Sequence, residues 1–361
     1  MTNDAARSTA PASPDAPAPT APAAPPRWKN PWRALPRLRW AVQLAYLAFL
    51  VLVGWEFVRF AGQAAGDGPI TASRPPAVEG FLPIAALVGL RRLLATGYWD
   101  EVHPAGLTIL LAAVGAAFAA RKGFCAWVCP VGTVERALEA LGRRTLWRRR
   151  WPAVPRWLDL PLSGLKVLLL AFFVVTVFVQ MPLDAVAGFL RAPFNLVADA
   201  KMLEFFRSPS ATALAVFGFL AALSLVVKHA WCRWLCPYGA LLGLAGLLSP
   251  LSVRRDPEAC TDCRACTRAC PAEIQVHSKL RVLSSECTGC LSCVAACGSQ
   301  DCLTLTRKGR RGLPPWLLPA AVVGVMLGAF ALASATGFWQ TAVSPETFRW
   351  AYRVMGIGAA P

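Results

Sequence analysis

The chain has 361 residues, of which 56% are hydrophobic and 16% are charged, and its mean hydropathy is +0.46. This composition excludes an ordinary soluble domain and predicts several membrane spans. Lys and Arg outnumber Asp and Glu by 37 to 20. Because the basic residues stand in blocks beside apolar runs, they indicate membrane topology rather than nucleic-acid binding.

The first 39 residues are predicted to be a disordered tail. Residues 1–26 are almost all Ala, Pro, Ser and Thr, with little apolar surface to bury. A group of basic residues then precedes the first apolar run: Arg27, Lys29, Arg33, Arg37 and Arg39. This order predicts an uncleaved membrane anchor whose N-terminus lies in the cytoplasm.

Five apolar stretches are long enough to cross a hydrocarbon core of about 30 Å. They cover residues 40–60, 104–120, 159–180, 211–228 and 315–337. A shorter stretch, 81–97, is interrupted by Arg91 and Arg92, which favours an interfacial or re-entrant helix.

The Lys and Arg residues outside these spans predict the topology. The segments on one side of the predicted membrane hold 27 Lys and Arg, and those on the other side hold 8. The first side is therefore expected to be cytoplasmic, with the C-terminus outside. All 13 Cys then lie on the cytoplasmic side, where thiols stay reduced, so metal ligation is favoured over disulfides.

A cysteine pair occurs twice, 107 residues apart: "FCAWVCPVG" at 124–132 and "WCRWLCPYG" at 231–239. Pro favours the first helical turn, so the second Cys of each pair should lie at a helix N-terminus, where N–H groups stabilise a thiolate. The four residues are predicted to share a metal, a further cluster or a redox-thiol site: Cys125, Cys129, Cys232 and Cys236. The alternative is that each motif only ends a helix at the membrane surface.

Two runs with the spacing C-x2-C-x2-C-x3-C follow within residues 260–297. This spacing supplies three thiolates to one [4Fe–4S] cluster and the fourth to another, and eight cysteines exceed the four ligands of a zinc site. Crossed ligation predicts one cluster on Cys260, Cys263, Cys266 and Cys297, and a second on Cys287, Cys290, Cys293 and Cys270. Cys302 lies outside the pattern and is interpreted as a small packed residue.

Together these motifs resemble the NapH/NosR/YccM-type membrane iron–sulfur electron-transfer proteins, and most closely the YccM-like branch. The segments "VEGFLPIAALVGLRRLL", "DEVHPAGLTIL" and "FNLVADAKMLEFF" strengthen the resemblance, which covers roughly residues 40–310. The resemblance implies electron transfer between the quinone pool or a cytoplasmic donor and a partner reductase, often a periplasmic one. NosR-like members carry an extra outer flavin-binding domain, for which this chain has no outer segment large enough.

We therefore expect an all-α polytopic membrane protein of about five transmembrane helices with an inserted cytoplasmic α+β two-cluster ferredoxin-like domain. The expected parts are a disordered tail, a transmembrane core, the ferredoxin-like domain, and a last helix with an external tail: 1–39, 40–250, 251–312 and 313–361. The expected location is the bacterial inner membrane.

The expected function is electron transfer as a subunit of an oxidoreductase system, without catalytic residues of its own. The alternative is a membrane iron–sulfur redox sensor, or an assembly factor for a metalloenzyme. A quinone site would need a proton acceptor, for which Asp100, Glu101 and His103 are the candidates.

Overall fold

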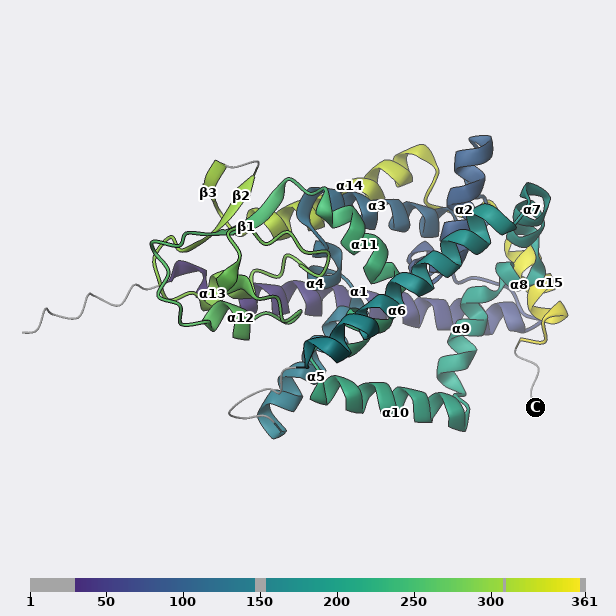
Figure 1. Ribbon diagram of the computed structural model, residues 1–361. Helices are drawn as coiled ribbons and strands as arrows, with labels where there is room; N and C mark the ends of the chain where they lie inside the picture. The colour runs from purple at the N-terminus through teal and green to yellow at the C-terminus, as the bar shows by residue number, and fades with distance from the viewer. Residues whose placement is uncertain (1–29, 147–153, 308–309, 358–361) are drawn as a thin grey trace, which may run out of the picture.

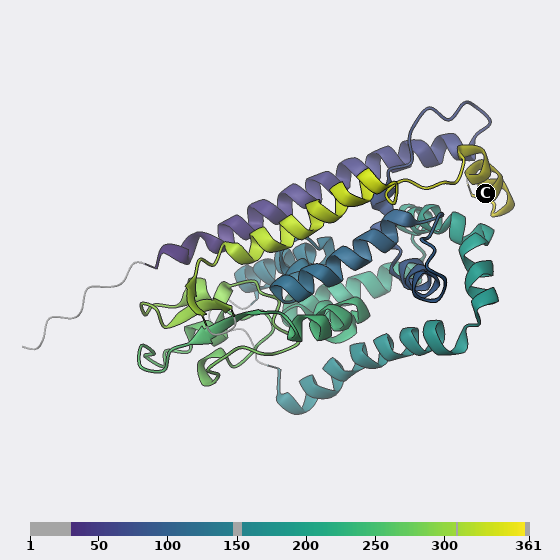
Figure 2. The same ribbon diagram turned by 90° about the horizontal axis from the view of Figure 1, so that it is seen from above.

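The computed structural model describes residues 30–146, 154–307 and 310–357. Long helices run in broadly one direction, with the ferredoxin-like segment at one end of the bundle (Figure 1). The C-terminal helix lies at the other end, as Figure 2 also shows. We call that other end, formed by the short helices described below, the distal end.

The predicted spans coincide with the helices of the bundle. These are α1 (Leu35–Ala65), α3 (Pro104–Ala120), α6 (Arg156–Val175), α10 (Ala211–Val226) and α14 (Leu317–Thr336). A π-helical turn, Thr176–Gln180, extends α6. Within the described residues, three helical stretches are long and apolar enough to cross a membrane singly, and the pair α9 and α10, bent by 81°, would be a fourth.

Helix α3 lies at the centre of the bundle and packs against α2, α11 and α14. Its 17 residues include five alanines with no exposed surface: Ala105, Ala113, Ala116, Ala117 and Ala120. Such small side chains let helix backbones approach one another closely. The sequence of α3 therefore suits an interior helix of the bundle.

The distal end is built from short elements. These are η2 (Pro76–Phe81), α2 (Pro83–Thr96), α7 (Leu183–Arg191), α8 (Pro193–Leu196), α9 (Ala198–Arg207) and α15 (Pro345–Val354). Helix α2 corresponds to the predicted interfacial helix, and it runs across the direction of α1 and α3 in both views (Figures 1 and 2). A crosswise helix of 14 residues fits an interfacial position better than a span.

At the opposite end each cysteine pair is followed by a helix. The first copy comprises α4 (Gly123–Trp127) and α5 (Pro130–Thr145). The second comprises the π-helical turn η4 (Trp231–Leu235) and α11 (Pro237–Leu247). The two copies therefore repeat one local plan, a short turn of helix, the second cysteine, and a longer helix that begins at proline.

The ferredoxin-like segment is α+β, as predicted. It contains β1 (Leu251–Arg255), α12 (Ala265–Arg268), η5 (Val276–Ser278), α13 (Ser292–Ala296), β2 (Leu303–Arg307) and β3 (Arg310–Leu313). The strands form an antiparallel sheet in the order β1-β2-β3, with Leu251 opposite Arg307. Its core is continuous with apolar residues of α3, α4 and α14, such as Ala120, Trp127 and Leu318.

The prediction of a disordered tail is wrong for residues 30–39, while residues 1–29 lie outside the described part of the chain. Residues Pro31–Ala34 form the short helix η1, and α1 begins at Leu35. The Asn30 amide donates to the backbone oxygens of Val294 and Cys297, each at 2.9 Å. Polar side chains that satisfy buried carbonyl groups therefore order this segment, which composition alone does not reveal.

Candidate functional site

The first of two cysteine-lined pockets lies in the ferredoxin-like segment between α12 and α13. Its lining includes Cys260, Cys263, Cys266 and Cys297, the set expected for one cluster. Cys263 is exposed, so this pocket lies at the protein surface. A backbone hydrogen bond from Asp262 and the side chain of Arg255 lower the pKa of the Cys260 thiol.

The second pocket is lined by the other expected set, Cys270, Cys287, Cys290 and Cys293. These residues are buried or partly buried, and burial raises the pKa of Cys270 to about 12. Each pocket thus draws three cysteines from one run and the fourth from the other. One site faces solvent, and the other lies in the interior.

Left-handed residues recur at the same places in both cysteine runs. Asp262 and Gly289 occupy the second position after the first cysteine, with φ of 49° and 61°. Arg264 and Leu291 follow the second cysteine, with φ of 56° and 58°, and each caps the short helix that carries the third. Two left-handed residues per turn wrap the chain tightly around a centre, which directs successive thiols to one side.

The chemistry of these pockets fits iron–sulfur clusters, because four thiols per site is the donor set of a [4Fe–4S] cluster. A zinc ion would need four sulfur atoms arranged tetrahedrally, each about 2.3 Å from the metal. Among the described residues, no group of three or more Cys, His, Asp or Glu side chains could hold a single metal ion in this way.

The repeated motifs place their second cysteines at helix N-termini, as predicted. Cys129 caps α5 and Cys236 caps α11, and the N–H of Gly239 donates to the Cys236 sulfur at 3.3 Å. The predicted stabilisation of thiolate by N–H groups is present at Cys129, but burial outweighs it. Burial raises the pKa of this thiol to about 11, although the N–H groups of Gly132 and Val131 lower it.

The structure brings the thiols of the two copies into one neighbourhood. Burial raises the pKa of Cys232, and the charges of Cys129 and Cys125 from the other copy raise it further. Burial also raises the pKa of Cys125, and the charge of Cys236, from the other copy, raises it further. The thiols of Cys125, Cys129 and Cys232 are therefore neutral near pH 7 unless a cation displaces their protons.

The second ferredoxin site packs directly on the first copy of the repeated motif. The indole N–H of Trp127, between Cys125 and Cys129, donates to the backbone oxygen of Gly289 at 3.2 Å. A Cβ at position 289 would lie 3.1 Å from the Ala120 oxygen, so glycine permits this close approach.

Buried cations line the same interface. Glu286, next to Cys287, accepts from Lys166 at 2.6 Å and pairs with Lys122 at 3.8 Å. Arg121 donates to the Ser284 oxygen at 2.7 Å. Burial lowers the pKa of Lys122, but negative charge at Cys125, once its proton is displaced, and at Glu286 outweighs the effect of burial, so the pKa is raised. The surplus of positive charge suits anionic sulfur ligands on both sides of the interface.

The quinone-site candidates lie at the distal end, remote from the cysteines. Asp100 and His103 are buried, whereas Glu101 is exposed, and its backbone oxygen accepts from Ala342 and Thr341. His103 belongs to a buried polar cluster with Arg74, Glu79 and Asp199. The sequence prediction missed those three, because they are brought together only by long-range packing.

Sequence profiles match both cysteine regions. A 4Fe-4S dicluster domain matches residues 252–298, and a 4Fe-4S binding domain matches residues 102–150 and 210–255, the two copies of the repeated motif. YccM of Escherichia coli (strain K12), a candidate electron transport protein, is 39% identical over 329 residues, which cover 89% of this chain and 91% of YccM. The chain belongs to the YccM family.

Two further relatives are less similar to this chain than YccM is. The ferredoxin-type protein NapH of Haemophilus influenzae is 32% identical over 56% of this chain and 65% of NapH. The protein NirI of Paracoccus denitrificans is 27% identical over 71% of this chain and 38% of NirI. No solved structure matches the chain. The resemblance predicted from the paired motifs is confirmed, and it identifies this YccM-family chain as an iron–sulfur protein of the ferredoxin type with membrane helices.

Proposed function

We propose that the protein is a subunit that passes electrons between the quinone pool or a cytoplasmic donor and a partner reductase. The observation that carries the proposal is the spatial order of the cysteine sites. The first site opens to solvent at Cys263, and the second is buried against the repeated cysteine motifs. This order forms a path from a soluble face of the protein to its membrane core.

We assign the ligands of the two clusters from the two pockets. One cluster is held by Cys260, Cys263, Cys266 and Cys297, and the other by Cys287, Cys290, Cys293 and Cys270. Clusters of this kind store single electrons, at potentials set by charge, hydrogen bonds and solvent exposure. The chain provides different surroundings for the two sites. Solvent reaches the first, and the surplus of Lys122 and Lys166 over Glu286 stabilises negative charge at the second.

The repeated motifs provide a third site, which we propose binds a further iron–sulfur cluster. Support comes from the 4Fe-4S profile that matches both copies and from the raised pKa values of Cys125 and Cys232, one from each copy. Because thiols with raised pKa values release their protons only to a strong competitor, ligation of a cluster suits this site better than free redox thiols.

The bacterial inner membrane, with the ferredoxin-like segment in the cytoplasm, is the location that we propose. Support comes from the asymmetry of Lys and Arg between the two ends of the bundle. A periplasmic reductase as partner would require a carrier across the membrane, for which quinone diffusion is our proposal.

A redox sensor or assembly factor is the alternative function. Reduced clusters that quinone analogues fail to reoxidise would favour that alternative.

Anaerobic purification of the whole protein tests the proposal. We expect about eight iron and eight sulfide in the two ferredoxin sites, with EPR signals of reduced clusters. Iron in excess of these eight atoms would belong to the third site, and we expect C129S to lose it. We also expect C129S to lose electron flow to a quinone analogue, while the EPR signals of the two ferredoxin clusters persist. Zinc in place of iron, or normal electron flow in C129S, would contradict the proposal.

A further inference from the structure

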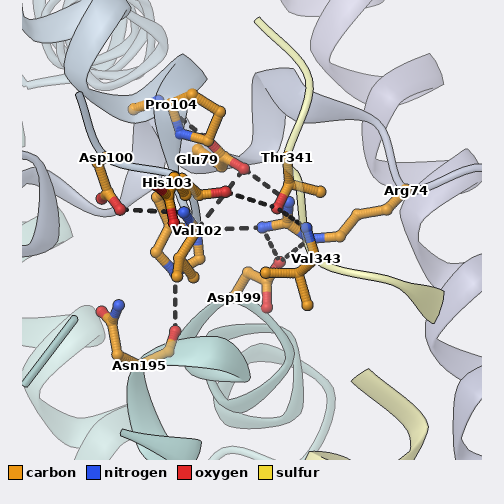
Figure 3. Close-up of polar contacts among 12 residues, drawn as sticks. Arg74, Glu79, Asp100, Val102, His103, Pro104, Asn195, Asp199, Thr341 and Val343 are labelled. Atoms are coloured by element: carbon orange, nitrogen blue, oxygen red, sulfur yellow. Dashed lines mark hydrogen bonds and ion pairs between the residues drawn. The ribbon is translucent and has the colours of Figure 1, made fainter. Parts of the chain in front are cut away.

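The distal end holds a buried cluster of ionisable side chains that electron transfer through the cysteine sites does not use. Its members are all buried and come from segments far apart in the sequence: Arg74, Glu79, Asp100, His103 and Asp199. Figure 3 shows these side chains converging between the loop after α1, the loop before α3, and α9. Buried charges are costly unless they are paired, so the arrangement calls for an explanation.

Arg74 is the centre of the cluster. Its guanidinium lies 2.6 Å from Glu79 and 2.7 Å from Asp199, and it stacks 5.0 Å above the Phe348 ring of α15. The second oxygen of Glu79 accepts the N–H of Gly106, in the first turn of α3, at 3.0 Å. One ion network thus connects η2, α3, α9 and α15.

His103 can bind a proton in this network at only one of its two nitrogens. Its Nε2 lies 2.7 Å from the backbone oxygen of Asn195. A carbonyl oxygen only accepts, so Nε2 carries a hydrogen in both protonation states. Nδ1 is therefore the titrating atom. It lies 3.3 Å from a nitrogen of Arg74 and 3.6 Å from an oxygen of Glu79.

Both states of Nδ1 have a partner. A neutral imidazole accepts from Arg74, and an imidazolium donates toward Glu79 while Arg74 keeps its contact with Asp199. The two states therefore differ in charge rather than in the number of satisfied groups. With neutral His103, two carboxylates face one guanidinium, which leaves one uncompensated negative charge in the interior. With imidazolium, these four groups are neutral.

Two further titratable groups face the cluster. Asp100 accepts the N–H of Val102 at 3.0 Å through one oxygen, and the other oxygen is buried without a hydrogen-bond partner in the described residues. The Tyr352 hydroxyl of α15 is also buried and without such a partner there. Asp100 contributes either no charge or a negative charge, so neither group replaces the positive charge of the imidazolium.

We propose that the distal cluster is a proton-binding site, that Nδ1 of His103 takes one proton from the surrounding water, and that this proton holds the distal segments together. Burial by itself lowers the pKa of His103, but the hydrogen bond and charge of Glu79 outweigh it, so the pKa is raised. A raised pKa in the folded state stabilises the fold fully below the unfolded value of about 6.5. That stabilisation is lost as the pH rises through the folded pKa, so the distal end acts as a pH-sensitive latch.

Histidine-selective ¹⁵N NMR of the full chain in lipid nanodiscs tests the proposal. The chain has three histidines, so H103Q identifies the signal of His103 by its loss. We expect its pKa to exceed 6.5 and to fall by roughly 1 to 3 pH units in E79Q, which removes the facing charge. E101Q is the matched control, because Glu101 is exposed and should not shift it. A pKa at or below 6.5, or equal shifts in both variants, would overturn the proposal.

Hydrogen–deuterium exchange separates a latch from a passive titration. In the wild type, we expect η2 and α9 to exchange faster above the His103 pKa than below it, after correction for the intrinsic pH dependence of exchange, whereas H103Q should show no such difference between the two pH values. Exchange of α14 should not change across the titration in either protein. Equal protection of α9 on both sides of the titration would refute the latch. This test needs no electron-transfer assay, so its result does not depend on whether the proposed function is correct.

Discussion

At the scale of single residues, Cys302 has a role that its spacing does not suggest. It is buried as predicted, but it also lines the first cysteine pocket, and its sulfur lies 3.8 Å from the Asp256 backbone oxygen. It is close enough to Cys260 and Cys297 to hydrogen-bond with their sulfurs. A thiol donor beside cluster ligands withdraws electron density from them, which raises the reduction potential.

We therefore expect C302A to lower the midpoint potential of the first cluster. C302S should retain most of the wild-type value, because its hydroxyl can still donate. EPR-monitored redox titration measures both clusters at once, so the second cluster, whose pocket Cys302 does not line, is the internal control. Iron content near eight per chain would show that both variants assemble. Equal midpoint potentials of the first cluster in wild type, C302A and C302S would show that Cys302 serves only as a packed side chain.

At the scale of elements, the two copies of the repeated motif should differ in their tolerance of substitution. A Cβ at Gly132 would overlap the backbone oxygen of Cys125, which cannot move without shifting α4. A Cβ at the equivalent Gly239 would lie 3.3 Å from Nζ of Lys122, the end of a flexible side chain. Crowding a tightly packed backbone costs about 1 to 3 kcal/mol.

We expect G132A to destabilise the protein by about that amount and G239A to have a smaller effect. Thermal unfolding in detergent, followed at equal protein concentration, measures the difference, and metal content reports whether the third site survives. The comparison is internal, because the same substitution is made at the same place in each copy. A larger loss in G239A would show that the two copies pack differently from the structure described above.

Local patterns predicted the elements that depend on local sequence. Hydropathy located the long apolar helices, because burial in a bundle or membrane needs only a continuous apolar run. Pro130 and Pro237 located two helix starts, since proline suits a first turn. The order in residues 30–39 could not be predicted, because Asn30 pairs with backbone groups of residues 294–297.

For the candidate sites too, only the features that depend on residues close in the sequence could be predicted. The crossed cysteine sets could be proposed from spacing, since each run acts as one short loop. The distal cluster could not, because Arg74 meets an acidic partner 125 residues away in Asp199. The raised pKa of the Cys129 thiol could not be predicted either, because the sequence indicates the helix start but not the burial of the thiol.

At the scale of the whole molecule, the ferredoxin-like segment and the C-terminal helix lie at opposite ends of the bundle (Figure 2). The segments that carry the cysteine sites are therefore separated from those that carry the distal cluster. This separation matters because the two ends face different compartments if the bundle spans the membrane. Basic residues are concentrated at the end with the cysteine sites, which predicts that this end is cytoplasmic. The distal cluster would then respond to the pH of the outer compartment.

Reporter fusions to the full chain test this orientation. We expect alkaline phosphatase fused after residue 361 to be active and a fluorescent protein at the same place to be dark, because the C-terminal helix follows α14 at the distal end. A fluorescent protein fused before residue 1 should be bright. The reverse result at both ends would place the cysteine sites outside. Since that side is oxidising in bacteria, reduced thiols and iron–sulfur clusters would be hard to maintain there, and the electron path proposed from Cys263 inward would lose its cytoplasmic donor.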